Sequence, residues 1–270
     1  MMNPLPKITL ITPSFNQGLF IEKTIKSVLE QGYPDLEHIV IDGGSTDQTL
    51  DILRAYEQQL TWLSEPDRGQ THAINKGLRL ATGEVIGYVN SDDILLPGSL
   101  LKVGQFFCDH PQASWLTGKC RMIDQNDEEV RKPITFYKNL WLQMRKSQML
   151  AVMDYVSQPA TFWRRQVIED VGYFDERHNY AMDYDYWLRL RKRYKLWYLD
   201  DYLACFRVHP ASKGGSSFEA QFEDDMQVAR SHIESPTLLK LHEIHNALIV
   251  TVYKLLLAWA RRQSHSEEIS

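Results

Sequence analysis

The chain has 270 residues, of which 43% are hydrophobic, and its formal net charge at pH 7 is −5. A chain of this length can bury one large core or two abutting cores, so we expect one compact unit with two lobes. The acidic balance, with no Lys/Arg cluster before the last predicted helix, argues against a protein that binds nucleic acid through its phosphates.

The cysteines and the apolar segments indicate the cellular compartment in which we expect the protein. Cys108, Cys120 and Cys205 are widely spaced and form no CxxC pair, so we predict neither a disulfide framework nor a structural zinc site. Residues 1–7 lack the apolar core of a secretory signal. The most apolar segment, residues 247–260, is interrupted by polar residues and is short for a membrane span. We therefore expect a cytoplasmic protein.

The first hundred residues alternate strand-like and helix-like segments, which is typical of a parallel sheet covered by helices. The predicted strands are residues 8–12, 38–41, 60–63 and 85–90, and the predicted helices start near Ile21, near Ser45 or Thr46, and at Gln70. In such sheets ligands bind at the carboxyl ends of the strands. Pro13, Asp42 and Asp92 each follow a strand, so we expect them to share one rim.

Beyond residue 108 the alternation is less regular. We predict strands at 115–123 and 197–208, irregular or helical cover at 136–152, and helices at 183–194 and 237–262. The chain then divides into residues 1–107, 108–215 and 216–270.

Asp92 and Asp93 are adjacent carboxylates at a predicted strand end. Two such groups repel each other unless a cation lies beside them, and Mg²⁺ or Mn²⁺ prefers oxygen ligands of this kind. The alternative is a turn in which Asp93 caps the following helix. The sequence leaves both interpretations open.

Two further polar residues follow strands. Asp42 precedes Gly43 and Gly44, so it either forms a simple turn into a capped helix or accepts hydrogen bonds from a nucleobase or ribose. Arg68 follows the third strand, where it is either solvated surface or a partner for a diphosphate.

Asp183 and Asp185 begin a predicted helix, where carboxylates ordinarily cap. The alternative is that one of them removes a proton from an acceptor, and a near-normal carboxyl pKa would suffice for this at neutral pH. His209 becomes a metal-ligand candidate only if the chain returns to the aspartate rim.

Several chemistries are disfavoured because their motifs are absent. The sequence has no GxxxxGK[ST] loop, no GxGxxG fingerprint, no HExxH and no GxSxG. These absences argue against P-loop NTPases, dinucleotide oxidoreductases, zincin proteases and α/β-hydrolases.

Eight short segments occur in order between about residues 8 and 210. They are Ile11-Thr-Pro-Ser-Phe-Asn16, Ile39-Val-Ile-Asp-Gly-Gly-Ser-Thr-Asp47, Glu65-Pro-Asp-Arg-Gly-Gln70, Asn75-Lys-Gly77, Thr82-Gly-Glu84, Asn90-Ser-Asp-Asp93, Met182-Asp-Tyr-Asp-Tyr-Trp187 and Phe206-Arg-Val-His209. Together they resemble the family 2 glycosyltransferases, an inverting family with the GT-A fold. The resemblance implies an α/β fold with a Rossmann-like, mostly parallel sheet flanked by helices, here with a C-terminal helical extension.

The resemblance also implies roles. Pro13 and Asp42 would line the nucleobase and ribose pocket with Arg68 nearby, Asp92 would lie at the ribose or ion region, Asp93 would bind the divalent ion, Asp183 would be the catalytic base, and His209 would complete the metal or diphosphate site. Met182 stands where the family usually has Glu. Residues 1–107 would bind the nucleotide sugar, 108–215 would hold the acceptor and the catalytic base, and 216–270 would be the extension.

The implied reaction moves a sugar from a UDP-, dTDP- or GDP-linked donor to a carbohydrate or lipid-linked acceptor, with Mn²⁺ or Mg²⁺, in surface polysaccharide or glycoconjugate biosynthesis. One alternative is a non-catalytic nucleotide-sugar-binding subunit of a polysaccharide assembly complex. Another is a sugar-phosphate nucleotidyltransferase, which is disfavoured because no Gly-rich, Arg-containing loop follows Thr12.

The last helix, at 237–262, is interpreted first as an element that packs on the core. Its end, with Trp259, Arg261 and Arg262, also suits the surface of an anionic bilayer, so a peripheral contact with the inner face of the cell membrane is a second hypothesis.

Overall fold

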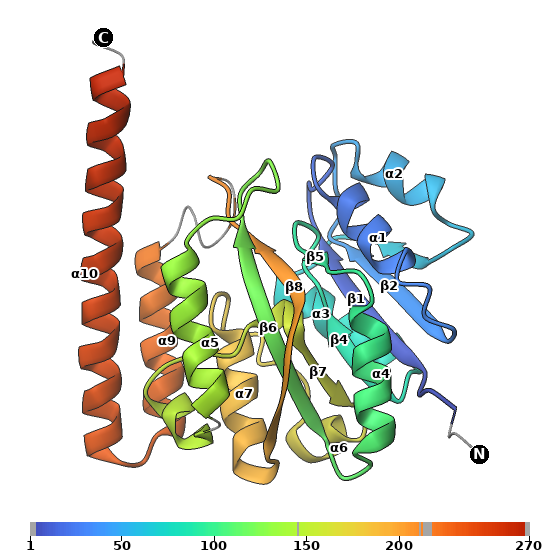
Figure 1. Cartoon of the computed structure of the whole chain (residues 1–270). Coiled ribbons are helices and arrows are strands. Elements are labelled where there is room, and N and C mark those ends of the chain that lie inside the picture. The colour runs from blue at the N-terminus through green and yellow to red at the C-terminus, as the bar shows by residue number, and fades with distance from the viewer. Residues whose placement is uncertain (1–3, 145, 211, 213–217, 268–270) are drawn as a thin grey trace.

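The computed structural model describes residues 4–144, 146–210, 212 and 218–267. Figure 1 shows a sheet with helices on both sides and a long C-terminal helix along one side. The strands are β1 (Ile8–Ser14), β2 (Leu36–Asp42), β3 (Thr61–Ser64), β4 (Val85–Tyr88), β5 (Ile94–Leu95), β6 (Trp115–Ile123), β7 (Thr161–Arg164) and β8 (Leu196–Arg207). The helices are α1 (Ile21–Leu29), α2 (Thr49–Ala55), α3 (Gln70–Leu80), α4 (Ser99–Asp109), α5 (Lys132–Met144), α6 (Val167–Val171), α7 (Met182–Arg193), α9 (Phe218–His232) and α10 (Pro236–Glu267), with 3₁₀ turns η1 (Ser147–Ala151) and η2 (Gln158–Ala160).

The described strands form one eight-stranded sheet in the order β3-β2-β1-β4-β7-β6-β8-β5. The pairs β3-β2, β2-β1, β1-β4 and β6-β8 are parallel, whereas β7 is antiparallel to both of its neighbours and β5 is antiparallel to β8. The parallel first half and the flanking helices confirm the predicted fold class. The antiparallel strands β5 and β7 were not predicted.

The predicted elements agree best with the structure where the hydrophobic pattern in the sequence is longest. The structure confirms the helix from Gln70, which is α3, and the strand at 115–123, which is β6. The sequence analysis missed α4, β7 and α9. β7 has four residues buried largely on both faces, which leaves no alternation to detect. The predicted boundary at 107 falls inside α4, and the boundary at 215 lies outside the described residues.

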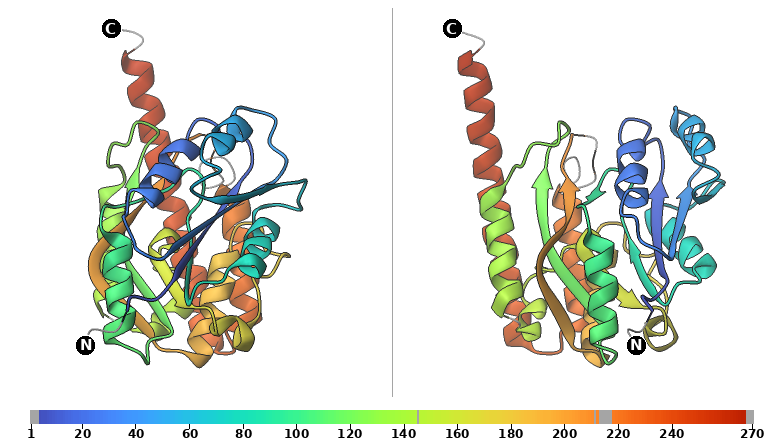
Figure 2. Two further views of the ribbon diagram at one scale, coloured as in Figure 1. Left: turned by 90° about the vertical axis from the view of Figure 1, so that its right-hand side faces the viewer. Right: turned by 45° about the vertical axis from the view of Figure 1, so that its right-hand side comes forward.

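Each face of the sheet carries its own core, because successive strand residues point to opposite sides. Leu10 and Phe162 lie in the core that α1 and α4 cover, whereas Ile11 and Trp163 lie in the larger core that α3 and α7 cover. Figure 2 shows these helix layers on the two sides of the sheet. The expected lobes are therefore two cores separated by one sheet.

Stacked aromatic rings fix α7 on the sheet. The Trp187 ring lies 5.8 Å from Trp115 of β6 and 5.9 Å from Trp163 of β7. Tyr186 stacks on Phe174 with the ring centroids 4.1 Å apart. Because such pairs favour particular geometries, they hold the start of α7, with Asp183, in a defined place.

The C-terminal helices pack on α7. Helix α9 contacts α7 and α10 contacts α9, and Figure 1 shows α10 continuing past the rest of the fold. Within the described residues, no helix is both long and apolar enough to cross a bilayer. The side chains of Trp259, Arg261 and Arg262, on which the membrane-surface hypothesis depends, lie outside the described residues.

Gly77, from the predicted Asn75-Lys-Gly77 motif, lets α3 approach β1 closely. A Cβ atom at this position would lie 2.5 Å from Cγ2 and 3.1 Å from Cγ1 of Ile11. Both positions are buried. The motif therefore serves packing beneath the rim of the sheet.

We expect Gly77→Ala to destabilise the protein by about 1–3 kcal/mol, because the added methyl group overpacks the contact with Ile11. Urea unfolding measures the change. Leu80→Ala, on the exposed part of the same helix, is the control and should change stability by less than about 0.5 kcal/mol. Stabilisation by Gly77→Ala, as for a solvent-facing helix position, would contradict the packing argument.

Candidate functional site

The carboxyl ends of the first three strands lie side by side. Ser14 at the end of β1 is in register with Asp42 at the end of β2, and Asp42 is in register with Ser64 at the end of β3. Pro13 is buried one position earlier, opposite Ile41. Pro13 and Asp42 therefore do lie at one edge of the sheet.

Asp42 is fully buried and holds the loop that follows it. Its Oδ2 accepts hydrogen bonds from the backbone N–H of Gly44 and Ser45, at 3.0 and 2.8 Å, and from Ser64 Oγ at 2.7 Å. Its Oδ1 accepts from Ser45 Oγ at 2.5 Å. These contacts show that Asp42 forms the turn, while its Oδ1, which accepts one hydrogen bond, keeps a lone pair for a further donor.

The loops after β1 and β2 are bonded to each other. The Asn16 N–H donates to Ser45 Oγ at 2.7 Å, and the Thr46 N–H donates to Asn16 Oδ1 at 2.9 Å. Asn16 adopts a left-handed conformation with φ of 52°, which asparagine tolerates better than most residues. The two loops form one wall beside the rim.

Arg68 lies on the surface, with 70% of its side chain exposed. Its Nη2 is 2.6 Å from Glu176 Oε2, and Asn75 Nδ2 also donates to Glu176, at 3.2 Å. To contact a diphosphate, Arg68 would have to leave Glu176.

Asp93 is a buried anchor. Its side chain is 0% exposed, its Oδ1 accepts the Arg207 N–H at 2.8 Å, and its Oδ2 accepts Asn90 Nδ2–H at 3.0 Å. Burial, together with the neighbouring charge of Asp92, raises its pKa well above the usual carboxyl range. Asp93 does not cap the next helix, because α4 begins only at Ser99, after Gly98. This burial also does not suit the metal-ligand role that we predicted for Asp93.

Asp92 is the accessible member of the pair, with 16% of its side chain exposed. Its Oδ2 lies 3.1 Å from Nε2 of His209, and its backbone oxygen accepts Arg207 Nε–H at 2.7 Å. The chain therefore does return to the aspartate rim, which was the condition for His209 to be a metal-ligand candidate.

One carboxylate oxygen and one imidazole nitrogen fit a divalent cation such as Mn²⁺ or Mg²⁺, provided that a diphosphate and water supply the other ligands. Among the described residues, no group of three or more His, Cys, Asp or Glu side chains could hold a metal by itself. The donor set of Asp92 and His209 thus suits a metal held jointly with a substrate.

Arg207 was part of a quoted motif, but we gave it no role. It is fully buried, lies over the Phe20 ring at 5.2 Å, and donates through Nη1 to the Asp124 backbone oxygen at 2.7 Å. Its Nη2 has no hydrogen-bond partner among the described residues. Its Nη1 also lies 2.5 Å from Asp127 Oδ1. Arg207 is therefore a candidate cation for an anionic ligand only through Nη2 and only if the fully buried guanidinium becomes accessible.

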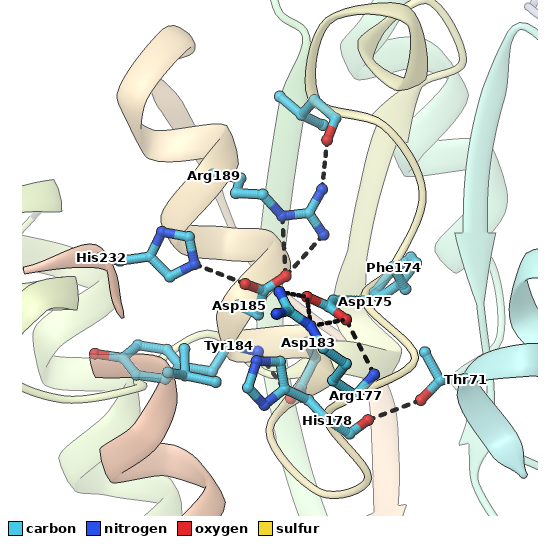
Figure 3. Close-up of polar contacts among 12 residues, drawn as sticks. Thr71, Phe174, Asp175, Arg177, His178, Asp183, Tyr184, Asp185, Arg189 and His232 are labelled. Carbon is cyan, nitrogen blue, oxygen red and sulfur yellow. Dashed lines mark hydrogen bonds and ion pairs between the residues drawn. The ribbon is translucent and has the colours of Figure 1, made fainter. Parts of the chain in front are cut away.

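Asp185 is committed to structural contacts, as Figure 3 shows. Its Oδ2 accepts from Nε and Nη2 of Arg189 at 2.9 and 2.7 Å, and its Oδ1 lies 2.6 Å from His232 Nε2. Burial raises the pKa of Asp185, but His232 and Arg189 lower it by more, so its pKa lies below the usual carboxyl value. Of the two acids on α7, Asp183 is therefore the candidate base.

Asp183 lies in the first turn of α7, where its Oδ1 accepts the Tyr184 N–H at 2.9 Å. Burial raises its pKa to about 6, against the lowering effects of this hydrogen bond and of Lys138, and Asp225 adds to the rise. The near-normal pKa that we expected is therefore wrong. A pKa nearer to neutrality suits a general base better.

A second partly buried acid with a raised pKa, Asp154, was missed because an isolated Asp in an irregular segment carries no signal. Burial raises its pKa to about 8, with Lys138 lowering it and Asp183 and Asp225 raising it. Its Oδ1 accepts the Val156 N–H at 3.2 Å. Asp154, Asp183, Asp225 and Lys138 thus form one electrostatic cluster.

Tyr88, at the end of β4, relates this cluster to the metal side of the site. Burial raises its pKa well above the usual value, and the charges of Asp183, Asp93 and Asp154 each add to the rise. Tyr88 therefore lies within electrostatic range of both acidic groups. The charges of Asp93 and Asp183 both act on Tyr88, while Asp42 ends β2 and Arg68 follows β3, beyond β1 in the sheet.

Solved structures share this fold. The chain matches the structure of S. aureus TarS residues 1–349 in complex with UDP-GlcNAc with a TM-score of 0.65. The sequence identity is 21%, and the match covers 85% of this chain and 67% of the TarS chain. It matches the mannosyltransferase PcManGT from Pyrobaculum calidifontis, in complex with GDP-Man and Mn²⁺, with a TM-score of 0.64, at 20% identity over 94% and 81%. Against a longer TarS chain it spans 42% of the length. The predicted GT-A fold is confirmed.

Sequence relatives agree. An uncharacterised glycosyltransferase of Mycobacterium tuberculosis is 32% identical over 193 residues, which cover 70% of each chain. A putative teichuronic acid biosynthesis glycosyltransferase of Bacillus subtilis is 37% identical over 123 residues, 44% of this chain and 48% of that protein. The model of the family described as Glycosyl transferase family 2 matches residues 9–172, more than half of the chain. The chain therefore belongs to glycosyltransferase family 2.

Proposed function

We propose that this glycosyltransferase moves a sugar from a UDP-, dTDP- or GDP-linked donor to an acceptor hydroxyl with inversion at the anomeric carbon. The observation that carries the proposal is the Asp92–His209 pair, whose Oδ2 and Nε2 atoms lie 3.1 Å apart just after β4. Beside it stands Asp183, a carboxylate with a raised pKa whose charge acts on Tyr88, the last residue of β4. A base and a leaving-group site that face a shared space are what a single displacement requires.

In this mechanism Asp183 accepts the proton of the acceptor hydroxyl as its oxygen bonds to C1 of the donor sugar. The bond between C1 and the β-phosphate oxygen breaks at the same time, and the nucleoside diphosphate leaves. Asp92 and His209 would hold a divalent cation, which when bound neutralises charge on the leaving diphosphate. Arg207, and Arg68 once it leaves Glu176, supply further positive charge. Pro13 and the loop that Asp42 holds form the wall for the nucleobase.

The names of two relatives support a substrate class. The B. subtilis relative is named for teichuronic acid biosynthesis, and a Staphylococcus epidermidis relative, 24% identical over 172 residues, is a poly-beta-1,6-N-acetyl-D-glucosamine synthase. We propose a carbohydrate or lipid-linked acceptor in surface polysaccharide or glycoconjugate assembly, at the cytoplasmic side of the cell membrane.

We expect Asp183→Asn to reduce kcat by about 10²–10⁴-fold while nucleotide binding persists, because the variant keeps the shape of the site but lacks the base. Donor hydrolysis or transfer in the presence of Mn²⁺ measures kcat, and calorimetry with UDP, dTDP and GDP measures binding. Asp185→Asn is the comparison and should lower stability more than kcat, since Asp185 bonds Arg189 and His232. Wild-type turnover by Asp183→Asn would contradict the assignment.

The pH dependence follows from the same residue. Asp183 acts when deprotonated, so kcat/KM should be constant above its pKa of about 6 and fall about tenfold per pH unit below it. Initial rates between pH 4.5 and 8.5, at a donor concentration well below KM, test this. An acid limb near the ordinary carboxyl value of about 4 would contradict the raised pKa.

Asp92 and Asp93 should respond differently to substitution. Asp92→Asn should weaken Mn²⁺-dependent binding of the nucleoside diphosphate by more than about tenfold. Asp93→Asn should instead reduce stability by about 1–3 kcal/mol, because the amide N–H₂ would face one of two hydrogen-bond donors. Calorimetry with and without Mn²⁺, and thermal unfolding, separate the two effects. The reverse pattern would restore the metal role to Asp93.

The alternative of a non-catalytic nucleotide-sugar-binding subunit predicts donor binding without turnover. The same assays decide, because donor binding with neither transfer nor slow hydrolysis in the presence of Mn²⁺ would favour that alternative.

A further inference from the structure

The C-terminal helices lie beyond residues 9–172, which the family model matches, yet they pack on the helix that carries the candidate base. Asp224 of α9 accepts the N–H groups of Tyr180 and Ala181 at 2.8 and 3.0 Å, just before α7 begins. Helix α9 is therefore fastened to the segment that leads into Asp183.

The next residue, Asp225, is held rigidly between α9 and α10. Its Oδ1 lies 2.7 Å from Nε2 of His242 and 2.5 Å from Nδ2 of Asn246, both on α10. Asn246 Nδ2 also lies 3.0 Å from the His242 ring nitrogen. His242 is fully buried and Asn246 nearly so. Two buried polar side chains thus hold the Asp225 carboxylate, of which the side chain is 16% exposed.

These contacts continue to the base. The His242 ring stacks on Tyr184 with an interplanar angle of 5° and 5.8 Å between centroids, and its Nδ1 lies 3.5 Å from Tyr184 Oη. Tyr184 Oη donates to the Leu150 backbone oxygen at 2.8 Å, and the Tyr184 N–H is the donor to Asp183. A continuous set of contacts therefore joins α10 to the Asp183 carboxylate.

Three charged groups from three different parts of the chain act on the pKa of Asp183. Lys138 of α5 favours its ionised form, Asp225 of α9 opposes it, and Asp154, before η2, is coupled to it through mutual repulsion. Among these groups, Asp225 is the one supplied by the C-terminal helices.

We propose that Asp225, held by His242 and Asn246, is a positioning residue for Asp183, so that α9 and α10 are part of the catalytic apparatus of this enzyme. The inference rests on the proposed function, in which Asp183 is the base. Its negative charge keeps the proton affinity of Asp183 high, so that the base can capture the acceptor proton. The helices thus act on the reaction through one fixed charge.

The direct test is Asp225→Asn, which keeps the acceptor oxygen for His242 but removes the charge. With less repulsion, Asp183 ionises more readily, so the acid limb of kcat/KM should move to lower pH. At pH 5, activity relative to its own maximum should rise on the order of threefold over wild type, as a shift of about half a pH unit gives. Asp225→Glu should return the acid limb of kcat/KM toward its wild-type position. Lys138→Gln should move the acid limb to higher pH, because Lys138 lowers the pKa of Asp183.

Glu243→Gln is the matched control. It removes the same charge from α10, but Glu243 is bonded to Lys240 at the surface, so the limb should stay in place. An unmoved acid limb in correctly folded Asp225→Asn would overturn the inference, because a merely structural role lowers stability without shifting a pH profile.

A second measurement does not depend on turnover. Carbon-13 NMR of labelled aspartate carboxyls identifies the Asp183 signal by its loss in Asp183→Asn and follows its titration directly. A lower midpoint in Asp225→Asn, with Glu243→Gln unchanged, supports the inference, and equal midpoints overturn it. If wild type shows neither transfer nor donor hydrolysis, the proposed function fails while this titration still decides the electrostatic link.

Discussion

The site depends on one buried contact, between the Asp93 carboxylate and the backbone N–H of Arg207. Asp93 lies between β4 and β5, and β5 pairs with β8, which ends at Arg207, so this hydrogen bond extends the β5–β8 pairing. An unpaired carboxylate at full burial would be costly, and two N–H donors satisfy it here. The contact brings His209 to Asp92. The two ligands that we propose for a cation, Asp92 and His209, are thus brought together by this strand connection.

The sequence predicted the rim well, because strand ends, turn residues and the α3 periodicity are local features. Pro13 and Asp42 stand where the βα pattern places them. Which of two adjacent acids faces solvent was not readable, since Asp92 and Asp93 differ only in burial. That difference arises from β8, more than a hundred residues away, and it is the reason that we propose Asp92 in place of Asp93 as the metal ligand.

The acceptor side could be predicted only in part. The motif around Asp183 pointed to the residue that we propose as the base, but its pKa depends on burial and Asp225, which raise it, and on Lys138, which lowers it. Asp154 gave no signal at all, because an isolated acid in an irregular segment has no period and no motif. Long-range electrostatics of this kind depends on tertiary packing, whereas the sequence pattern reports mainly local structure.

The single sheet has a mechanical consequence. β4, in the predicted donor half, pairs directly with β7, in the predicted acceptor half, through the register Val85↔Arg164 to Gly87↔Phe162. A rigid-body rotation of one half away from the other would break these backbone hydrogen bonds and separate the residues of the cores on both faces of the sheet. Hinge closure of the kind seen in two-domain enzymes is therefore not available to this fold. The loops at the strand ends must therefore enclose the substrate, while the sheet beneath them keeps its shape.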